Sequence, residues 1–68
     1  MNKKRYVKEF ANDILENDKN NKLMKDWLKE ERKETIEYIL EDYNDGFITA
    51  IEAVYKLATI SQHRKQND

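Results

Sequence analysis

Apolar residues recur at helical spacing along most of the chain. Between Tyr6 and Leu15 they lie three and four positions apart and fall on one half of a helical wheel, while charged and amide side chains fill the other half. This pattern predicts an amphipathic helix over residues 3–17. Residues 17–21 are polar and rich in Asn and Asp, which hydrogen-bond their own backbone instead of extending a helix.

A second helix is predicted over residues 21–44, with Asn20 or Asn21 as its N-cap. Its apolar residues form two sets, which are separated by residues 29–35, all charged except Thr35, and are rotated by roughly a third of a turn from each other. Two explanations fit: one long helix whose charged middle lies in water, held by pairs such as Glu30 with Lys33, or a break near residues 29–34. Good helix formers in this stretch favour the unbroken helix. The two sets are Leu23, Met24, Trp27, Leu28 and then Ile36, Tyr38, Ile39, Leu40, Tyr43.

The sharpest local signal lies between the second and third helices. Gly46, the only glycine of a chain without proline, suits the left-handed conformation that ends many helices. Thr49 and Glu52 have the spacing of a capping box, and Ile48 with Ala53 forms a weak hydrophobic staple. These features predict a corner of about four residues, a third helix over 49–63 and a flexible tail over 64–68.

The third helix is apolar around most of its circumference, since from Ala50 to Ile60 only Glu52, Lys56 and Thr59 are polar. Such a helix is normally buried on more than one side. At 68 residues the chain is a single domain with a small core, and it has no cysteine for disulfides. We therefore expect an all-α fold: a small three-helix bundle with a long, straight or bent second helix, completed by dimerisation.

Charge is unevenly distributed although the net charge is −1. Residues 1–29 carry eight basic and five acidic side chains, residues 30–52 two and eight, and residues 53–68 three and one. The acidic block places Glu30, Glu34, Glu37 and Glu41 on one helix face, which either is simply solvated or attracts a basic partner. The solvated face is the favoured interpretation.

Candidate chemistry is sparse. With Gly46 at the glycine position of an EF-hand loop, Asp45 and Glu52 match the pattern, but Glu41 and Tyr43 occupy positions that require short oxygen ligands. His63 and Ser61 have no orienting third group in sequence reach. We therefore expect no metal, no cofactor and no enzymatic activity.

A DNA-binding regulator is the alternative hypothesis. Its candidate phosphate contacts are Lys3, Lys4, Arg5 and Lys8 at one end and Arg64 and Lys65 at the other. The chain lacks the net positive charge that phosphate binding favours, and the third helix offers apolar residues where a recognition helix needs polar ones.

The pattern thus favours a small interaction or regulatory module that binds another protein, first of all a second copy of itself. Trp27 has two interpretations: a core residue that packs with Met24 and Leu28, which is favoured, or an interface anchor. The Lys, Asn, Ile and Glu content is typical of AT-rich bacterial, phage or mobile-element genomes, and a cytoplasmic location is expected because no signal peptide or membrane span is evident. The candidate interface residues are Ile51, Val54, Tyr55, Leu57, Ala58, Trp27 and Leu28.

Overall fold

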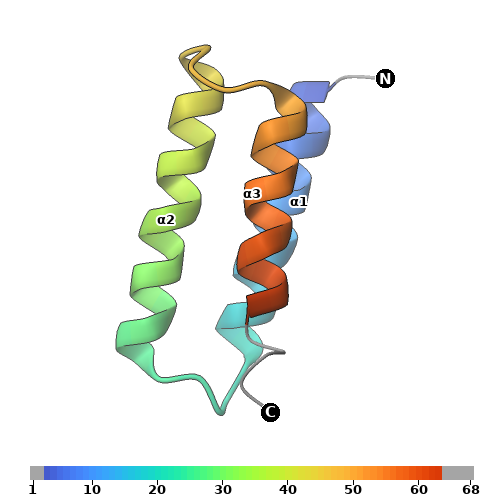
Figure 1. Ribbon diagram of the computed structural model, residues 1–68. Helices are drawn as coiled ribbons and strands as arrows, with labels where there is room; N and C mark the ends of the chain where they lie inside the picture. The colour runs from blue at the N-terminus through green and yellow to red at the C-terminus, as the bar shows by residue number, and fades with distance from the viewer. Residues whose placement is uncertain (1–2, 64–68) are drawn as a thin grey trace.

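The chain forms three helices that pack side by side (Figure 1). The computed structural model describes residues 3–63, in which α1 spans Lys3–Asn20, α2 spans Asp26–Asn44 and α3 spans Ala50–His63. The helices alternate in direction, so α1 and α3 run parallel and α2 runs antiparallel to both. The predicted all-helical, three-helix architecture is confirmed for the described residues, which contain no strand.

A small apolar core lies along the axis of the bundle. Each helix contributes the residues of one stripe, as its helical periodicity requires. Half-buried side chains such as Phe10, Leu40 and Val54 pack around this centre. The buried core residues are Val7, Ala11 and Ile14 from α1, Ile36 and Ile39 from α2, and Ala53 and Leu57 from α3.

The first connection differs from the prediction. Helix α1 continues to Asn20, and α2 begins only at Asp26, after an extended N-cap residue, Lys25, that makes no side-chain cap. Asn21 does not cap α2, because its Oδ1 atom accepts a hydrogen bond from the Leu23 amide at 3.0 Å and closes a local turn. The predicted N-cap at Asn20 or Asn21 is therefore wrong, and Leu23 and Met24 belong to the loop.

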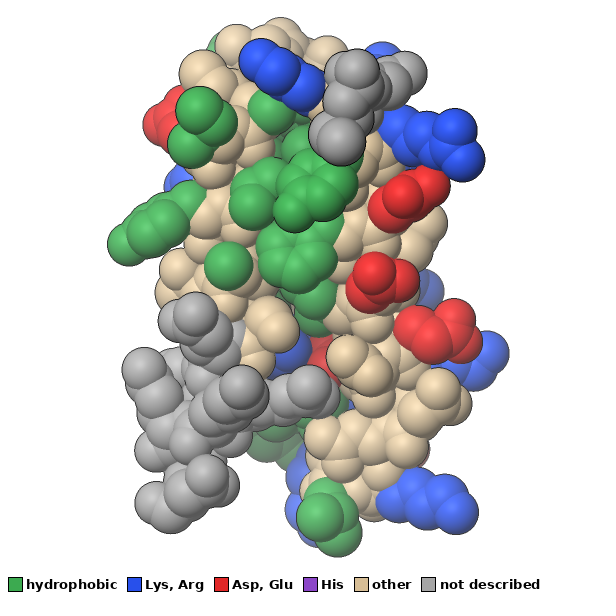
Figure 2. Space-filling model, turned by 90° about the vertical axis from the view of Figure 1, so that its right-hand side faces the viewer, with side chains coloured by type: hydrophobic (Ala, Val, Ile, Leu, Met, Phe, Trp, Pro, Cys, Tyr) green, Lys and Arg blue, Asp and Glu red, His purple; other side chains and the backbone are tan. Residues whose placement is uncertain are grey.

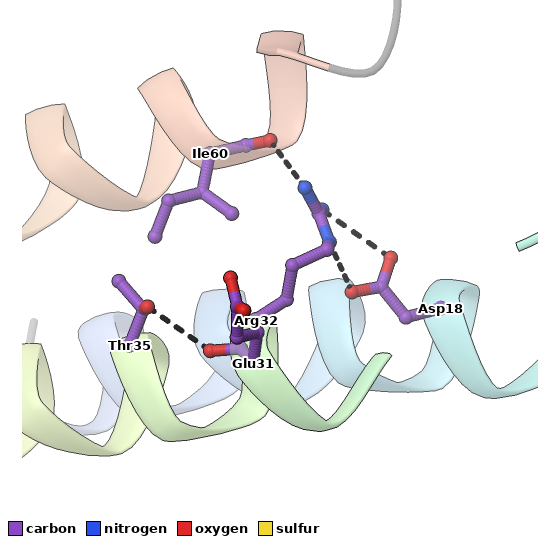
Figure 3. A network of polar contacts seen from close by, with 5 residues as sticks. All are labelled: Asp18, Glu31, Arg32, Thr35 and Ile60. Carbon is purple, nitrogen blue, oxygen red and sulfur yellow. Dashed lines mark hydrogen bonds and ion pairs between the residues drawn. The ribbon is translucent and has the colours of Figure 1, made fainter. Parts of the chain in front are cut away.

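Helix α2 is continuous through residues 29–35, but its charged middle does not lie wholly in water. Arg32 is buried, and its guanidinium contacts both other helices (Figure 3). Nε and Nη2 donate to the two carboxylate oxygens of Asp18 in α1, at 2.6 and 3.3 Å, and Nη1 donates to the carbonyl oxygen of Ile60 in α3 at 3.0 Å. One side chain thus links all three helices.

This arrangement satisfies several buried polar groups together. The Asp18 and Arg32 residues are only 3% and 9% exposed, so their charges are stable there only when paired. The Ile60 carbonyl is one of the last four of α3, which lack partners within the helix and attract positive charge. Among the described side chains, no buried nitrogen or oxygen atom lacks a hydrogen-bond partner.

The corner between α2 and α3 forms as the sequence predicts. Gly46 adopts a φ of 84°, its amide donates to the Tyr43 carbonyl at 3.1 Å, and the Phe47 amide donates to the Asp42 carbonyl at 2.9 Å. These two bonds are the Schellman motif that ends a helix. The capping box of α3 is also confirmed: the Thr49 amide donates to Glu52 Oε1 at 3.0 Å, and the Glu52 amide donates to Thr49 Oγ1 at 3.1 Å.

The buried pair predicts strong coupling between Asp18 and Arg32. Arg32→Met removes the guanidinium that pairs with the buried Asp18 carboxylate and should lower the free energy of unfolding by about 3–5 kcal/mol, whereas the double variant Asp18→Leu/Arg32→Met should recover most of that loss. Urea denaturation followed by circular dichroism measures both. Arg5→Met is the matched control, since the exposed Arg5–Glu9 pair contributes at most about 0.5 kcal/mol. An Arg32→Met variant as stable as the wild type would contradict the prediction.

The corner predicts a backbone effect at Gly46. A Cβ atom added there meets no atom within 4 Å, so the cost of Gly46→Ala comes from the positive φ alone. The free energy of unfolding should fall by about 1–2 kcal/mol. Asp45→Ala, at a neighbouring residue with φ of −83°, is the control and should change stability much less. Equal effects in the same urea titration would disprove the explanation.

Candidate interaction surfaces

An exposed apolar strip follows the boundary between α1 and α3. On α1, the rings of Tyr6 and Phe10 stack with centroids 6.5 Å apart and planes inclined by 22°. On α3, Ile51 is 80% and Tyr55 73% exposed. Figure 2 shows this side of the bundle, where apolar side chains gather in a central patch, further apolar side chains stand apart on one side of it, and acidic side chains lie along the other side. We call the following residues the α1–α3 strip: Tyr6, Phe10, Ala50, Ile51, Val54, Tyr55 and Ala58.

The strip is hollowed at the end where α1 begins. This shallow hollow is lined by Lys3 and Tyr6 from α1 and by Ala50, Ile51 and Val54 from α3. The hollow also shows that the first turns of α1 and α3 lie at the same height in the bundle. Most of its lining is apolar, so it suits an apolar side chain better than a small polar ligand.

Leu57 does not belong to this surface, although the sequence analysis included it among the interface residues. It is completely buried and lies in the core with Ala53. The apolar arc of α3 is wider than the surface that α1 and α2 cover, so one part of it forms the core and another part stays exposed. Val54 and Ala58 lie half-buried between these two parts.

Trp27 is not a core residue, and the favoured interpretation of the sequence is wrong on this point. Its side chain is 64% exposed, and Leu28 beside it is half-buried. Because α2 begins at Asp26, Trp27 lies in the first turn of the helix, while Met24 lies in the preceding loop. Trp27 is therefore at the opposite end of the bundle from Ile51, which follows the corner.

The acidic residues Glu30, Glu34, Glu37 and Glu41 are all exposed on α2. Three of them line a shallow depression together with Tyr38, namely Glu34, Glu37 and Glu41. At about 100° per residue, the four carboxylates fall on the side of α2 away from the buried Ile36 and Ile39. No ion pair with another described residue involves them, so this side of the bundle carries a concentrated negative potential.

The candidate phosphate contacts do not form one stripe. Lys3 borders the α1–α3 strip, whereas Lys4 and Lys8 line a groove between α1 and α2. Arg5 pairs with Glu9 at 3.0 Å. Arg64 and Lys65 lie outside the described residues.

A second set of lysines lies together in the fold although the sequence does not predict it. Lys19, Lys29 and Lys33 border a groove at the other end of the α1–α2 boundary, where Leu15 and the buried Asp18 also lie. Lys29 is tied to the bundle, since its Nζ atom donates to the Lys19 carbonyl near the end of α1 at 3.3 Å. Nothing in the sequence predicts that these lysines lie close together, because they come from two helices and their proximity depends on how the helices are aligned in the fold.

The remaining candidates for chemistry are few. Among the side chains that the structure describes, no three His, Cys, Asp or Glu residues are placed to hold a metal ion. Ser61 is half-buried in the last turns of α3, and the His63 side chain lies outside the described part. In the same part of the chain, every helix is too short or too polar to cross a membrane.

Comparisons of the chain with protein-family models, with curated proteins and with solved structures give no match.

Because Leu57 lies in the core and Ile51 on the surface, truncating each to alanine should lower the free energy of unfolding by different amounts. Leu57→Ala removes a completely buried side chain and should lower the free energy of unfolding by about 2–5 kcal/mol. Ile51→Ala, at a position 80% exposed, should change it by no more than about 0.5 kcal/mol. Both are measured by urea denaturation in dilute solution, where association does not contribute. Similar losses for the two variants would contradict this assignment of the core.

Proposed function

We propose that the protein is a non-enzymatic protein–protein interaction module that self-associates through the α1–α3 strip. The observation that carries the proposal is the exposure of three large apolar side chains, Ile51 and Tyr55 on α3 and Tyr6 on α1, of which Ile51 and Tyr6 line the same hollow. Each removes apolar surface from water when a partner covers it, at about 25 cal/mol for each Å². Contiguous apolar patches of this kind are typical of interaction sites.

The small core supports the same proposal. Among the described residues, seven apolar side chains are buried. A single core in a chain of this length rarely supplies more than about 3–5 kcal/mol, and oligomerisation is one of the common supplements. A second copy that covers the strip would add burial to the same two helices that form the hollow.

The other faces fit the centre of an interface less well. The outer side of α2 carries the four glutamates, and the α1–α2 boundary carries lysines at both ends. Charged residues are depleted in interface cores because their desolvation is costly. In a dimer formed through the α1–α3 strip, the acidic side of α2 and Trp27 stay accessible to a further protein.

The DNA-binding alternative stays a prediction with less support from the geometry. Binding to a duplex needs several basic side chains directed at phosphates from one surface. Lys3, Lys4, Arg5 and Lys8 are instead distributed around the first turns of α1, and Arg5 is paired with an acidic residue.

Two tyrosines of similar exposure test the proposal. Tyr55 belongs to the strip and is 73% exposed, whereas Tyr38 lies on α2 and is 67% exposed. Sedimentation equilibrium over a dilution series should show a dimer for the wild type. Tyr55→Gln should raise the dissociation constant at least about tenfold, because an interface tyrosine often contributes more than 1 kcal/mol. Tyr38→Gln should leave it unchanged.

A wild-type protein that stays folded and monomeric at millimolar concentration would overturn the proposal. Saturable binding of duplex DNA with a steep salt dependence would favour the alternative.

A further inference from the structure

On α1, the two aromatic residues of the strip lie between two opposite charges. This sequence pattern is complementary to the same pattern read in the reverse direction. Lys3, Tyr6, Phe10 and Asp13 follow one another at spacings of three, four and three residues. At about 100° per residue they occupy only about 80° of the helix circumference. Read backwards, the pattern places an aromatic residue on each aromatic position, Tyr6 on Phe10 and Phe10 on Tyr6, and the two charges exchange places.

The exposed and half-buried apolar residues of α3 in the strip repeat this symmetry. Ile51, Val54, Tyr55 and Ala58 are spaced evenly about a point between Val54 and Tyr55. The hollow places Lys3 and Tyr6 beside Ala50, Ile51 and Val54. Because parallel helices rise equally per residue, the midpoint on α3 lies near the height of Lys8, the midpoint on α1. Both halves of the strip therefore share one centre.

We infer that a second copy of the chain docks on the strip antiparallel, related by a two-fold axis that crosses both helices at the height of Lys8. This inference rests on the proposed self-association and specifies its geometry. In a two-fold interface, residue i contacts residue j of the partner and j contacts i. Tyr6 of each copy then meets Phe10 of the other, and Lys3 of each copy meets Asp13 of the other.

Charge pairing favours this antiparallel dimer over a dimer in which the two copies run parallel. Lys3 and Asp13 are both exposed, and neither forms an ion pair with another described residue. A two-fold axis along the bundle would instead place each α1 over the α3 of the other copy. Lys3 would then lie opposite the level of Ala50, and Asp13 opposite the level of Ile60, so both charges would lose water without gaining a partner. The antiparallel arrangement pairs both charges at the edge of the strip.

Zero-length crosslinking with a carbodiimide tests the arrangement directly. Within one straight helix, residues 3 and 13 lie about 15 Å apart, too far for an amide bond between their side chains. A crosslink between Lys3 and Asp13 must therefore join two chains. In a mixture of ¹⁴N- and ¹⁵N-labelled full-length protein, mass spectrometry should detect this crosslink as mixed-isotope peptides from the dimer.

Charge reversal provides the second measurement. Lys3→Glu alone and Asp13→Lys alone should each raise the dimer dissociation constant roughly three- to tenfold, because each places like charges together at two symmetric positions. The double variant Lys3→Glu/Asp13→Lys should restore the wild-type value. Lys8→Glu is the control, because it changes the net charge equally but lies on the α2 side of α1.

The possible outcomes distinguish failure of the antiparallel geometry from failure of the proposed self-association. A dimer that Tyr55→Gln weakens, but that gives no crosslink between Lys3 and Asp13 and no rescue in the double variant, overturns the antiparallel geometry and leaves self-association intact. A protein that is monomeric throughout the dilution series overturns both. Crosslinking and rescue together establish the geometry.

Discussion

The structure depends on one buried guanidinium. Arg32 extends from the middle of α2, forms two hydrogen bonds with Asp18 near the end of α1 and caps the Ile60 carbonyl near the end of α3 (Figure 3). Apolar contacts alone have little directional preference, so seven core residues could tolerate small shifts of one helix along another. A charge that must meet its partners within hydrogen-bond distance fixes the height of each helix much more narrowly.

This fixed register also determines what is left on the surface. With Ala53 and Leu57 directed into the core, Ile51 and Tyr55 cannot also be covered by α1 or α2. The α3 residues of the α1–α3 strip are therefore the part of a wide apolar arc that α1 and α2 leave uncovered. The dimer that we propose would use the symmetric placement of residues on this strip, and the acidic side of α2 lies apart from it.

Features of the fold that could be predicted from the sequence are those whose partners lie within a few residues. Gly46 and the pair Thr49 and Glu52 specify the corner by bonds spanning three to five positions, and their geometry follows from local sterics. Predictions from the sequence were wrong where a residue's interaction partner lies far away along the chain. Arg32 in a charged stretch resembles a solvated residue, because Asp18 and Ile60 lie 14 and 28 positions away.

The sequence by itself therefore determined the helical class, the corner and the presence of an apolar arc too wide for the bundle, because periodicity and local hydrogen bonding suffice for these. Only the tertiary structure decided which residues of that arc became core and which became surface, separating Leu57 from Ile51. It also moved Trp27 out of the core, since a turn at Asn21 delays the start of α2. In each case the deciding factor is the register between helices, which side chains far apart in sequence fix together.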